Sequence, residues 1–272
     1  MRALIVGYGK MGKAVEAALG ARGHAVAGKI DEGDRPEDFF KGDRPGILLE
    51  GESGGSRGSS GSGTTVAARK GRRRIFPSKN PSAVDIAFEF TTPASAGRLV
   101  VFLLSKRIPV VSGTTGWDTA PAVRVAREQK IPFLHSPNFS IGVAVMKRLA
   151  TQAAALFSPF SSFEPGILER HHAAKKDAPS GTAKLLASAV ESARAGARVP
   201  VVALRQGGQP GEHVLYFEGE SESLEIVHRA RSRAIFAAGA VAAAEWLLGS
   251  GRRGPATFEE FLDDVSRERT SR

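Results

Sequence analysis

A glycine-rich turn near the amino terminus constrains the fold more than any other feature of the sequence. Residues 3–6 are all apolar, as in a strand buried on both faces of a parallel sheet, and Gly7, Gly9 and Gly12 follow in the pattern G-x-G-x-x-G. Helix-forming residues with apolar side chains at helical spacing come next, and residues 25–30 have the pattern of a second strand. This order of strand, glycine turn, helix and strand predicts a βαβ unit of the dinucleotide-binding type.

Each glycine of the turn has a separate steric role. Gly7 permits the tight turn, Gly9 lets a pyrophosphate approach the backbone, and Gly12 lets the helix pack closely against the strand. The amides at the helix start, near Lys10 and Met11, have no acceptor within the helix and can hold the phosphates. We therefore expect dinucleotide binding here, with an ordinary strand–helix turn as the alternative.

Asp31 stands at the end of the second predicted strand, nineteen residues after Gly12. A carboxylate at this place accepts hydrogen bonds from the adenosine ribose and repels a 2′-phosphate, which favours NADH over NADPH. Lys29 and Arg35 are close enough in sequence to soften that preference. We expect NADH and/or NADPH as the cofactor, with NADH preferred.

The rest of the chain predicts two different kinds of sheet. Strands and helices alternate in the first half, which indicates a doubly wound parallel sheet, whereas three consecutive strands after residue 200 indicate a mixed or antiparallel sheet. We expect an α/β protein with an N-terminal Rossmann-type doubly wound parallel sheet and an inserted α+β domain. The first domain would comprise residues 1–137 and 234–272, the second residues 138–233, and residues 41–82 would form a flexible Gly/Ser-rich and basic insertion.

Composition narrows the class of protein. The chain has no cysteine, which excludes disulfides, thiolate nucleophiles and cysteine-based metal sites, and it has no apolar run of the roughly 18–20 residues that span a bilayer. With only a short apolar start it is expected to be soluble and cytoplasmic, without a membrane partner. The net charge is +10, but the one dense basic cluster, residues 69–74, lacks interleaved aromatic residues, so nucleic acid is a disfavoured partner.

The segment 169–182 carries the richest set of polar groups. Ser180 follows a proline and is a good N-cap, which predicts a helix whose first amides belong to Gly181 and Thr182. A carboxylate is the natural ligand of such amides, and Lys175 can add a full positive charge beside it.

Two adjacent histidines, His171 and His172, precede that helix, and either can exchange a proton near neutral pH. Neighbouring side chains on an extended segment point to opposite faces, and no third ligand is evident, so we expect no metal. The favoured interpretation is an acid/base site for an anionic substrate, and a polar loop that caps the helix is the alternative.

The run Glu-x-His-His-x-x-Lys-x-Asp-Ala-Pro-Ser-Gly-Thr over residues 169–182 resembles the signature of the 4-hydroxy-tetrahydrodipicolinate reductases, also called dihydrodipicolinate reductases. Residues 112–116, Ser-Gly-Thr-Thr-Gly, are similar to the Gly-Thr-Thr-Gly loop of that family. Residues 138–143 are similar to its Asn-Phe-Ser-x-Gly-Val segment. These landmarks occur in the family's order over most of the chain outside 41–82.

The resemblance implies NAD(P)H-dependent reduction of a cyclic dicarboxylate, 4-hydroxy-tetrahydrodipicolinate, in diaminopimelate and lysine biosynthesis. It implies that His171 is the acid/base residue and that Lys175 is a proton donor. It further implies a homotetramer assembled through the sheet of the inserted domain, which would bind substrate. The substrate-binding residues would be His172, Lys175, Ser180, Gly181 and Thr182, and the cofactor site would add Thr92, Gly113, Thr114, Thr115, Asn138 and Phe139 to Asp31 and the glycine turn.

The chain departs from the family pattern at the cofactor site. The glycine turn is one residue shorter than the family's Gly-x-x-Gly-Arg-Met-Gly, and Lys10 stands where arginine is frequent. Thr92 stands where many members have an arginine that can contact a 2′-phosphate, which again favours NADH. Two alternatives stay open: another NAD(P)-dependent imine or amino-acid oxidoreductase such as an aspartate dehydrogenase, and a nucleotide-responsive nucleic-acid-binding protein.

Overall fold

The computed structural model describes residues 1–31, 33–40 and 84–270. The insertion expected at 41–82 and the basic cluster within it lie outside the described residues. In chain order the elements are β1 (Arg2–Val6), α1 (Lys10–Ala21), β2 (Ala25–Ile30), α2 (Pro36–Phe39), β3 (Ile86–Glu89), α3 (Pro93–Ser105), β4 (Val110–Ser112), α4 (Ala120–Gln129), β5 (Phe133–His135), α5 (Ile141–Phe157), β6 (Glu164–His171), α6 (Gly181–Ala193), β7 (Val201–Arg205), β8 (Gly211–Glu218), β9 (Ser223–Ala230), α7 (Ala234–Gly249), β10 (Pro255–Ala256) and α8 (Phe258–Thr270).

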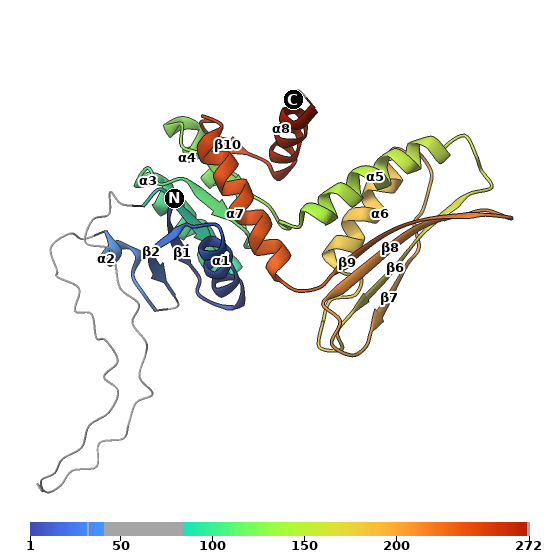
Figure 1. The fold of residues 1–272 in the computed structure, drawn as a ribbon, viewed down its shortest axis with the longest axis horizontal. Helices are drawn as coiled ribbons and strands as arrows, with labels where there is room; N and C mark the ends of the chain where they lie inside the picture. Colours follow the sequence, from blue (N-terminus) through green and yellow to red (C-terminus); the bar gives the residue numbers. More distant parts are fainter. Residues whose placement is uncertain (32, 41–83, 271–272) are drawn as a thin grey trace, which may run out of the picture.

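The first sheet is parallel and has helices on both faces, as the alternating pattern predicted. Its strand order is β10-β5-β4-β3-β1-β2 (Figure 1). One face packs against α1, α7 and α8, and the other face packs against α3 and α4. Ala3 to Val6 are at most 1% exposed, which explains why the first strand is apolar at every position rather than at alternate ones.

Two short elements were not predicted from the sequence. The two-residue strand β10 pairs in parallel with β5 and extends the sheet by one edge strand. The single-turn helix α2 follows β2 and buries Phe39 against the sheet. Neither segment is long enough to show a hydrophobic period, so tertiary packing rather than local pattern determines both.

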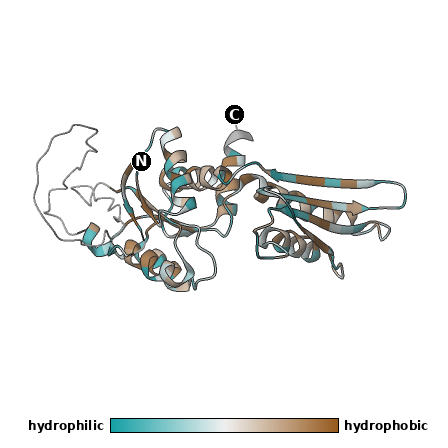
Figure 2. Ribbon diagram, turned by 90° about the horizontal axis from the view of Figure 1, so that it is seen from below, coloured by the Kyte–Doolittle hydropathy of each residue, from teal (hydrophilic) through white to brown (hydrophobic). Residues whose placement is uncertain are grey.

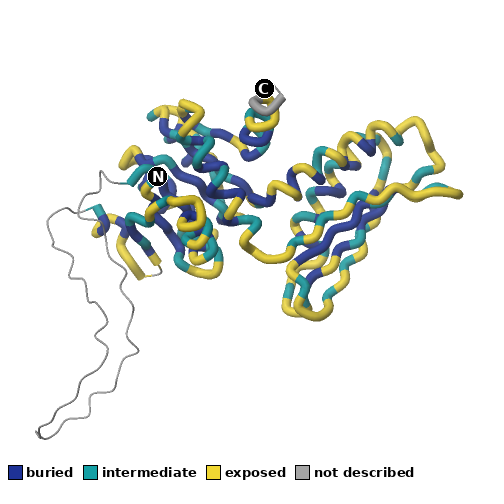
Figure 3. Tube along the Cα trace, viewed as in Figure 1, coloured by how far each residue is buried: buried dark blue, intermediate teal, exposed yellow. Residues whose placement is uncertain are grey.

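The second sheet is mixed and has the order β7-β6-β8-β9. β6 pairs with β7 in parallel and with β8 antiparallel, and β8 and β9 form an antiparallel pair. Helices α5 and α6 cover one face, where a third apolar cluster lies. Hydrophobic and hydrophilic residues alternate along the long strands in Figure 2, and Figure 3 shows buried residues in the interior strands, as a sheet with one covered face requires.

The chain crosses between the two sheets twice, after β5 and before α7 (Figure 1). Helix α7 packs against α1 and the first sheet, and its small residues allow close approach. At Gly239 an added Cβ would lie 1.8 Å from the carbonyl oxygen of Phe139, so only glycine fits there. Among the described residues, none of the helices has the length and apolar character needed to cross a bilayer.

Candidate active site

The glycine turn has the geometry that its three roles require. Gly7 has a φ of +91°, and an added Cβ would lie 2.3 Å from the carbonyl oxygen of Phe90. An added Cβ on Gly12 would lie 2.3 Å from the carbonyl oxygen of Gly7, so this glycine lets α1 pack on β1. At Gly9, the N-cap of α1, no described atom lies within 4 Å of such a Cβ, which leaves open space over the helix amides.

Asp31 lies beside this turn, where the sequence predicted it. The amide of Tyr8 donates to its Oδ1 over 3.2 Å. Lys29, which could have softened the preference for NADH, is held elsewhere: its Nζ lies 2.5 Å from Glu16 Oε1 and donates to the Tyr8 hydroxyl over 2.9 Å. The pKa of Lys29 is raised because these two partners outweigh the effect of burial.

Glu89 is a buried carboxylate that the sequence analysis missed. It ends β3, is 0% exposed, and accepts hydrogen bonds from Ser112 Oγ at 2.6 Å, Thr114 Oγ1 at 2.6 Å, and both the amide and the hydroxyl of Thr91, at 2.8 Å and 2.5 Å. These bonds tie together the ends of β3 and β4, at the edge where parallel sheets of this type bind nucleotides. In the sequence, Glu89 could have been noticed as the single acidic residue at the end of the apolar run 86–88.

The other expected cofactor residues are placed around that edge. Gly113 follows β4, and an added Cβ would lie 2.1 Å from the Phe90 ring. Thr92 is the exposed N-cap of α3, and Thr115 is exposed, whereas the Thr114 hydroxyl is committed to Glu89.

The side chain of Phe139, which was expected to line the cofactor site, is buried in the protein core. Its ring is 2% exposed and packs in the core against Phe90 and Phe258. Any contact of Phe139 with a cofactor would therefore come from its backbone.

Strand β6 places the candidate acid/base histidine inside the second sheet. Because side chains alternate along a strand, Glu169 and His171 both point to the covered face while Arg170 is exposed. His171 is 8% exposed, and its Nδ1 lies 2.7 Å from Oε2 of Glu169. His172 follows the strand and is half-buried.

Glu169 joins several elements at this point. It is 0% exposed, and its Oε1 accepts from the amide of Ser180 at 2.9 Å and from Nη2 of Arg205 at 2.6 Å. Burial alone would raise the pKa of Glu169, but the hydrogen bonds from Arg205 and Ser180 outweigh it and hold the pKa below its usual value. Glu169 is therefore an anion at neutral pH.

His213 was not singled out in the sequence, yet it lies opposite Glu169 in the β6–β8 register. Its Nε2 lies 3.1 Å from Ser180 Oγ, and its ring meets that of His171 edge-on with centroids 5.2 Å apart. Burial, with a smaller effect of the nearby His171, lowers the pKa of His213 to about 4. Burial also lowers the pKa of His171.

The sequence showed no third ligand near the two histidines, but the fold brings two further candidate groups to His171. Glu169, His171 and His213 bring ligand atoms within 4.8 Å of one another, because strand pairing places β8 beside β6. However, the guanidinium of Arg205 lies 2.6 Å from Glu169, and a fixed positive charge there opposes a second cation. We therefore assign no ion to this cluster.

The start of α6 has the predicted form. Ser180 is the N-cap and its Oγ accepts from the amide of Ala183 over 3.1 Å. Gly181 is exposed, and no described atom lies within 4 Å of an added Cβ, so a ligand can approach the backbone. Lys175 lies on the loop before the helix, and its Nζ donates to Asp177 Oδ1 over 2.7 Å.

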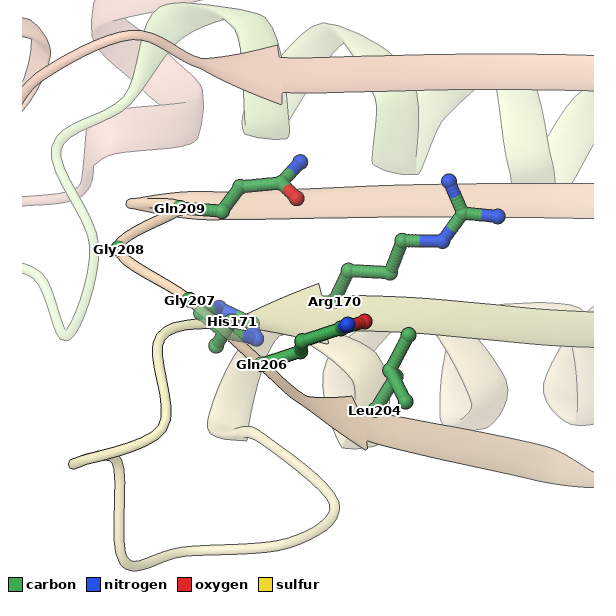
Figure 4. A pocket seen from close by; sticks show the side chains of 7 residues that line it. All are labelled: Arg170, His171, Leu204, Gln206, Gly207, Gly208 and Gln209. Atoms are coloured by element: carbon green, nitrogen blue, oxygen red, sulfur yellow. The ribbon is translucent and has the colours of Figure 1, made fainter.

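A pocket opens beside His171, at the ends of β6 and β7 (Figure 4). The loop between β7 and β8 passes over the histidine there. The pocket is lined by Arg170, His171, Leu204, Gln206, Gly207, Gly208 and Gln209. Candidate acid/base and anion-binding groups thus gather at one end of the second sheet, whereas the candidate nucleotide groups lie at one edge of the first.

Both halves of the sequence match one known protein family. The family described as "Dihydrodipicolinate reductase, N-terminus" matches residues 1–139, and "Dihydrodipicolinate reductase, C-terminus" matches residues 142–262. The chain belongs to the dihydrodipicolinate reductase family. Members of this family are oxidoreductases of the diaminopimelate and lysine pathway, so the resemblance stated from the motifs is confirmed.

Individual relatives agree with the family match. The 4-hydroxy-tetrahydrodipicolinate reductase of Thiobacillus denitrificans is 33% identical, covering 90% of this chain and 95% of its own. That of Christiangramia forsetii is 28% identical over 97% of this chain and 99% of its own. The dipicolinate-bound dihydrodipicolinate reductase of Paenisporosarcina sp. TG-14 has the same fold, with a TM-score of 0.68 and 19% identity over 94% of this chain and 97% of that one. The predicted fold class is confirmed.

Proposed function

We propose that this dihydrodipicolinate reductase uses NADH or NADPH to reduce 4-hydroxy-tetrahydrodipicolinate to tetrahydrodipicolinate. The observation that carries the proposal is the placement of His171, backed by the buried anion Glu169, on the same strand-to-helix segment as Lys175 and the open amides of α6. A dianionic ring needs donors for its carboxylates and a nearby proton. This segment supplies both.

The proposed roles follow the chemistry of each group. Gly181 and Thr182 offer backbone amides and a hydroxyl to one carboxylate, and Lys175 offers its ammonium group once the carboxylate displaces Asp177. His172 and Ser180 complete the proposed substrate-binding set, Ser180 by capping the helix. Bound NAD(P)H supplies the hydride. His171 then delivers a proton to the electron pair left on the ring, with Lys175 as a second donor.

The groups at the first sheet support cofactor binding with a preference for NADH. The residues that would hold the cofactor are Gly7, Gly9, Lys10, Met11, Gly12, Asp31, Thr92, Gly113, Thr114, Thr115, Asn138 and Phe139. Asp31 presents a carboxylate to the ribose, and Lys29 is bound to Glu16 rather than free to meet a 2′-phosphate. Closure of the second domain over the first would bring the nicotinamide to His171.

We propose a homotetramer formed through the uncovered face of the second sheet. On that face a row of Val202, Leu168, Val214 and Val227 crosses all four strands, and Val202 is 57% exposed. An apolar row of this kind on an open sheet face fits a subunit interface. The domains would be residues 1–137 with 234–272 for the cofactor, and 138–233 for substrate binding and oligomerisation. The cytoplasm, which supplies NADH and NADPH, is the proposed location.

The experiment is a turnover assay with both nucleotides and freshly prepared 4-hydroxy-tetrahydrodipicolinate. We expect oxidation of NADH, followed as loss of its absorbance, and a higher kcat/KM with NADH than with NADPH. Aspartate and other amino acids serve as competing substrates. No oxidation of either nucleotide with the dicarboxylate would refute the proposal, as would faster turnover of an amino acid.

A further inference from the structure

Glu169 is the buried carboxylate beside His171, and its two oxygens show how it acts on that histidine. Its two oxygens face different partners. Oε1 accepts hydrogen bonds from the backbone amide of Ser180 and from the guanidinium of Arg205, at 2.9 Å and 2.6 Å. Neither group can accept a hydrogen bond in return, so the atom at the Oε1 position must be an acceptor.

Oε2 faces the two histidines of the sheet. His171 Nδ1 lies 2.7 Å away and His213 Nε2 lies 3.9 Å away. Within the described part of the chain, neither Oε2 nor His171 Nδ1 makes a hydrogen bond of good geometry, although both atoms are buried. Leaving two such atoms unpaired costs about 1–3 kcal/mol each, and a proton on Nδ1 with a small ring rotation satisfies both.

The other ring nitrogen of His171 lies beside Gly211. An added Cβ on Gly211, which lies beside His171 on β8, would be 2.9 Å from Nε2. Glycine therefore keeps this side of the ring clear, and His171 is one of the residues that line the pocket in Figure 4. The two nitrogens of one imidazole thus have separate surroundings: Nδ1 lies beside a buried anion, and Nε2 lies beside Gly211, which has no side chain.

We propose that Glu169 is the positioning residue of the reaction: it holds a proton on His171 Nδ1, so that Nε2 is the nitrogen that delivers the proton to the reduced ring. This inference rests on the proposed function. Loss of the 4-hydroxyl group with a ring hydrogen, as water, gives the conjugated ring, and hydride addition then leaves an electron pair on it. The Nε2–H bond of the protonated His171 breaks, its electrons remain on the imidazole, and the proton forms a C–H bond with that pair. His171 ends neutral, with its Nδ1–H directed at Glu169.

Charges from every neighbouring element act on His171. Glu169 on β6 and Asp177 on the loop before α6 favour the protonated ring, whereas Lys175 and Arg205 oppose it. His213 on β8 is neutral at pH 7 because its pKa is about 4. Glu169 is the nearest of the anions, so removing its charge lowers the pKa of His171 further.

Substitution of Glu169 by glutamine tests the proposal because the two donors at Oε1 dictate how the amide turns. Its carbonyl must face Ser180 N and Arg205, so its NH₂ faces His171 Nδ1 and demands an acceptor there. The neutral ring then carries its proton on Nε2. The facing NH₂ group and the loss of the carboxylate charge both oppose a second proton on Nδ1, so delivery of the Nε2 proton would leave an imidazolate, which is far less stable than the neutral imidazole.

For Glu169→Gln we expect kcat to fall about 10²–10⁴-fold while KM for NADH stays unchanged. The alkaline limb of the kcat–pH profile should move to lower pH, since the reaction needs protonated His171. Glu164→Gln, at the exposed start of the same strand, is the matched control and should behave as wild type. Wild-type kcat in Glu169→Gln would overturn the proposal.

The tautomer itself can be measured without turnover. Imidazole ¹⁵N NMR, with the His171 signal assigned by its loss in His171→Gln, should show the Nδ1–H form in the neutral wild type and the Nε2–H form in Glu169→Gln. An Nε2–H wild type would overturn the proposal even if the enzyme is active. If the wild type fails to reduce the dicarboxylate, the proposed function fails while this measurement still decides the role of Glu169.

A second variant tests the assignment of Nε2 independently, with its fold checked by circular dichroism because Gly211 has a φ of +158°. In Gly211→Ala the methyl group crowds Nε2 from the opposite side and leaves Glu169 intact. We expect it to keep the Nδ1–H tautomer and to lose at least tenfold in kcat, because the methyl group occupies the space beside Nε2. Wild-type kcat in Gly211→Ala would contradict the assignment of Nε2 as the donor.

Discussion

The side-chain amide of Asn138 donates to Thr182 Oγ1 over 3.2 Å and thereby joins the segment that leaves the first sheet to the first turn of α6. Asn138 Oδ1 accepts from the amide of Ser140, the N-cap of α5, which fixes the orientation of the Asn138 amide. A residue expected at the cofactor site thus holds a residue expected at the substrate site. This bond is a direct physical link between the two proposed sites.

Replacing Thr182 by valine should weaken binding of the dicarboxylate. The change removes the acceptor for Asn138 and the hydroxyl offered to the substrate while keeping the side-chain shape. A lost hydrogen bond of this type is worth about 1 kcal/mol, so KM for the dicarboxylate should rise about fivefold. Steady-state kinetics of Thr182→Val and of Thr182→Ser, which retains the hydroxyl, provide the comparison. Equal KM values in the two variants would count against the role of Thr182.

Replacing Gly9 by alanine should leave the fold intact and weaken nucleotide binding. No described atom lies within 4 Å of the added methyl group, so the loss must come from the space that a pyrophosphate needs. Gly20, in the same helix and with the same free space, is the matched control. Fluorescence titration with NADH should show at least tenfold weaker binding for Gly9→Ala and no change for Gly20→Ala. The same Kd in both would show that phosphates do not approach this turn.

Removing the charge of Glu16 should increase the use of NADPH. In Glu16→Gln the ammonium group of Lys29 loses its partner at 2.5 Å and becomes free to meet a 2′-phosphate. A partly exposed ion pair of this kind is worth up to about 1 kcal/mol, so KM for NADPH should fall up to about fivefold while KM for NADH is unchanged. The gain should vanish in the double variant Glu16→Gln/Lys29→Gln. A gain that persists there would mean that Lys29 is not its source.

The stability of the protein should fall as the pH is lowered from about 6.5 to 4, in part because of His213. An unfolded histidine binds its proton near pH 6.5, whereas buried His213 does so only near its pKa of about 4. Between these values the unfolded state holds more protons, so acid favours unfolding by up to about 3 kcal/mol from this group.

Urea unfolding at pH 7, 6 and 5 measures this effect. The free energy of unfolding of His213→Asn should depend less steeply on pH than that of the wild type. His172→Gln, which removes an imidazole from the following loop, should keep the wild-type slope. Parallel curves for wild type and His213→Asn would show that His213 is not protonated on unfolding in this range.

Local patterns in the sequence were sufficient for most of the fold. The apolar run and glycines of residues 3–12 predicted β1, the turn and α1. Both the buried strand and the tight turn depend on residues that are adjacent in the sequence. The N-cap at Ser180 and the helix amides after it were predicted for the same reason. Segments without a period of their own, such as β10, were missed.

The sequence by itself determined the family, the alternation of strands and helices, and the segment that holds His171 and Lys175, since each depends on residues that are neighbours in the chain. Only the tertiary structure decided what surrounds His171. Strand pairing brings His213 opposite Glu169 and Arg205 opposite His171. No local sequence pattern predicts either pairing, because the paired residues are far apart in the chain. The same holds for Glu89, whose donors come from the ends of two strands. A buried charge is tolerated only where such distant donors converge, and their convergence is a property of the folded sheet.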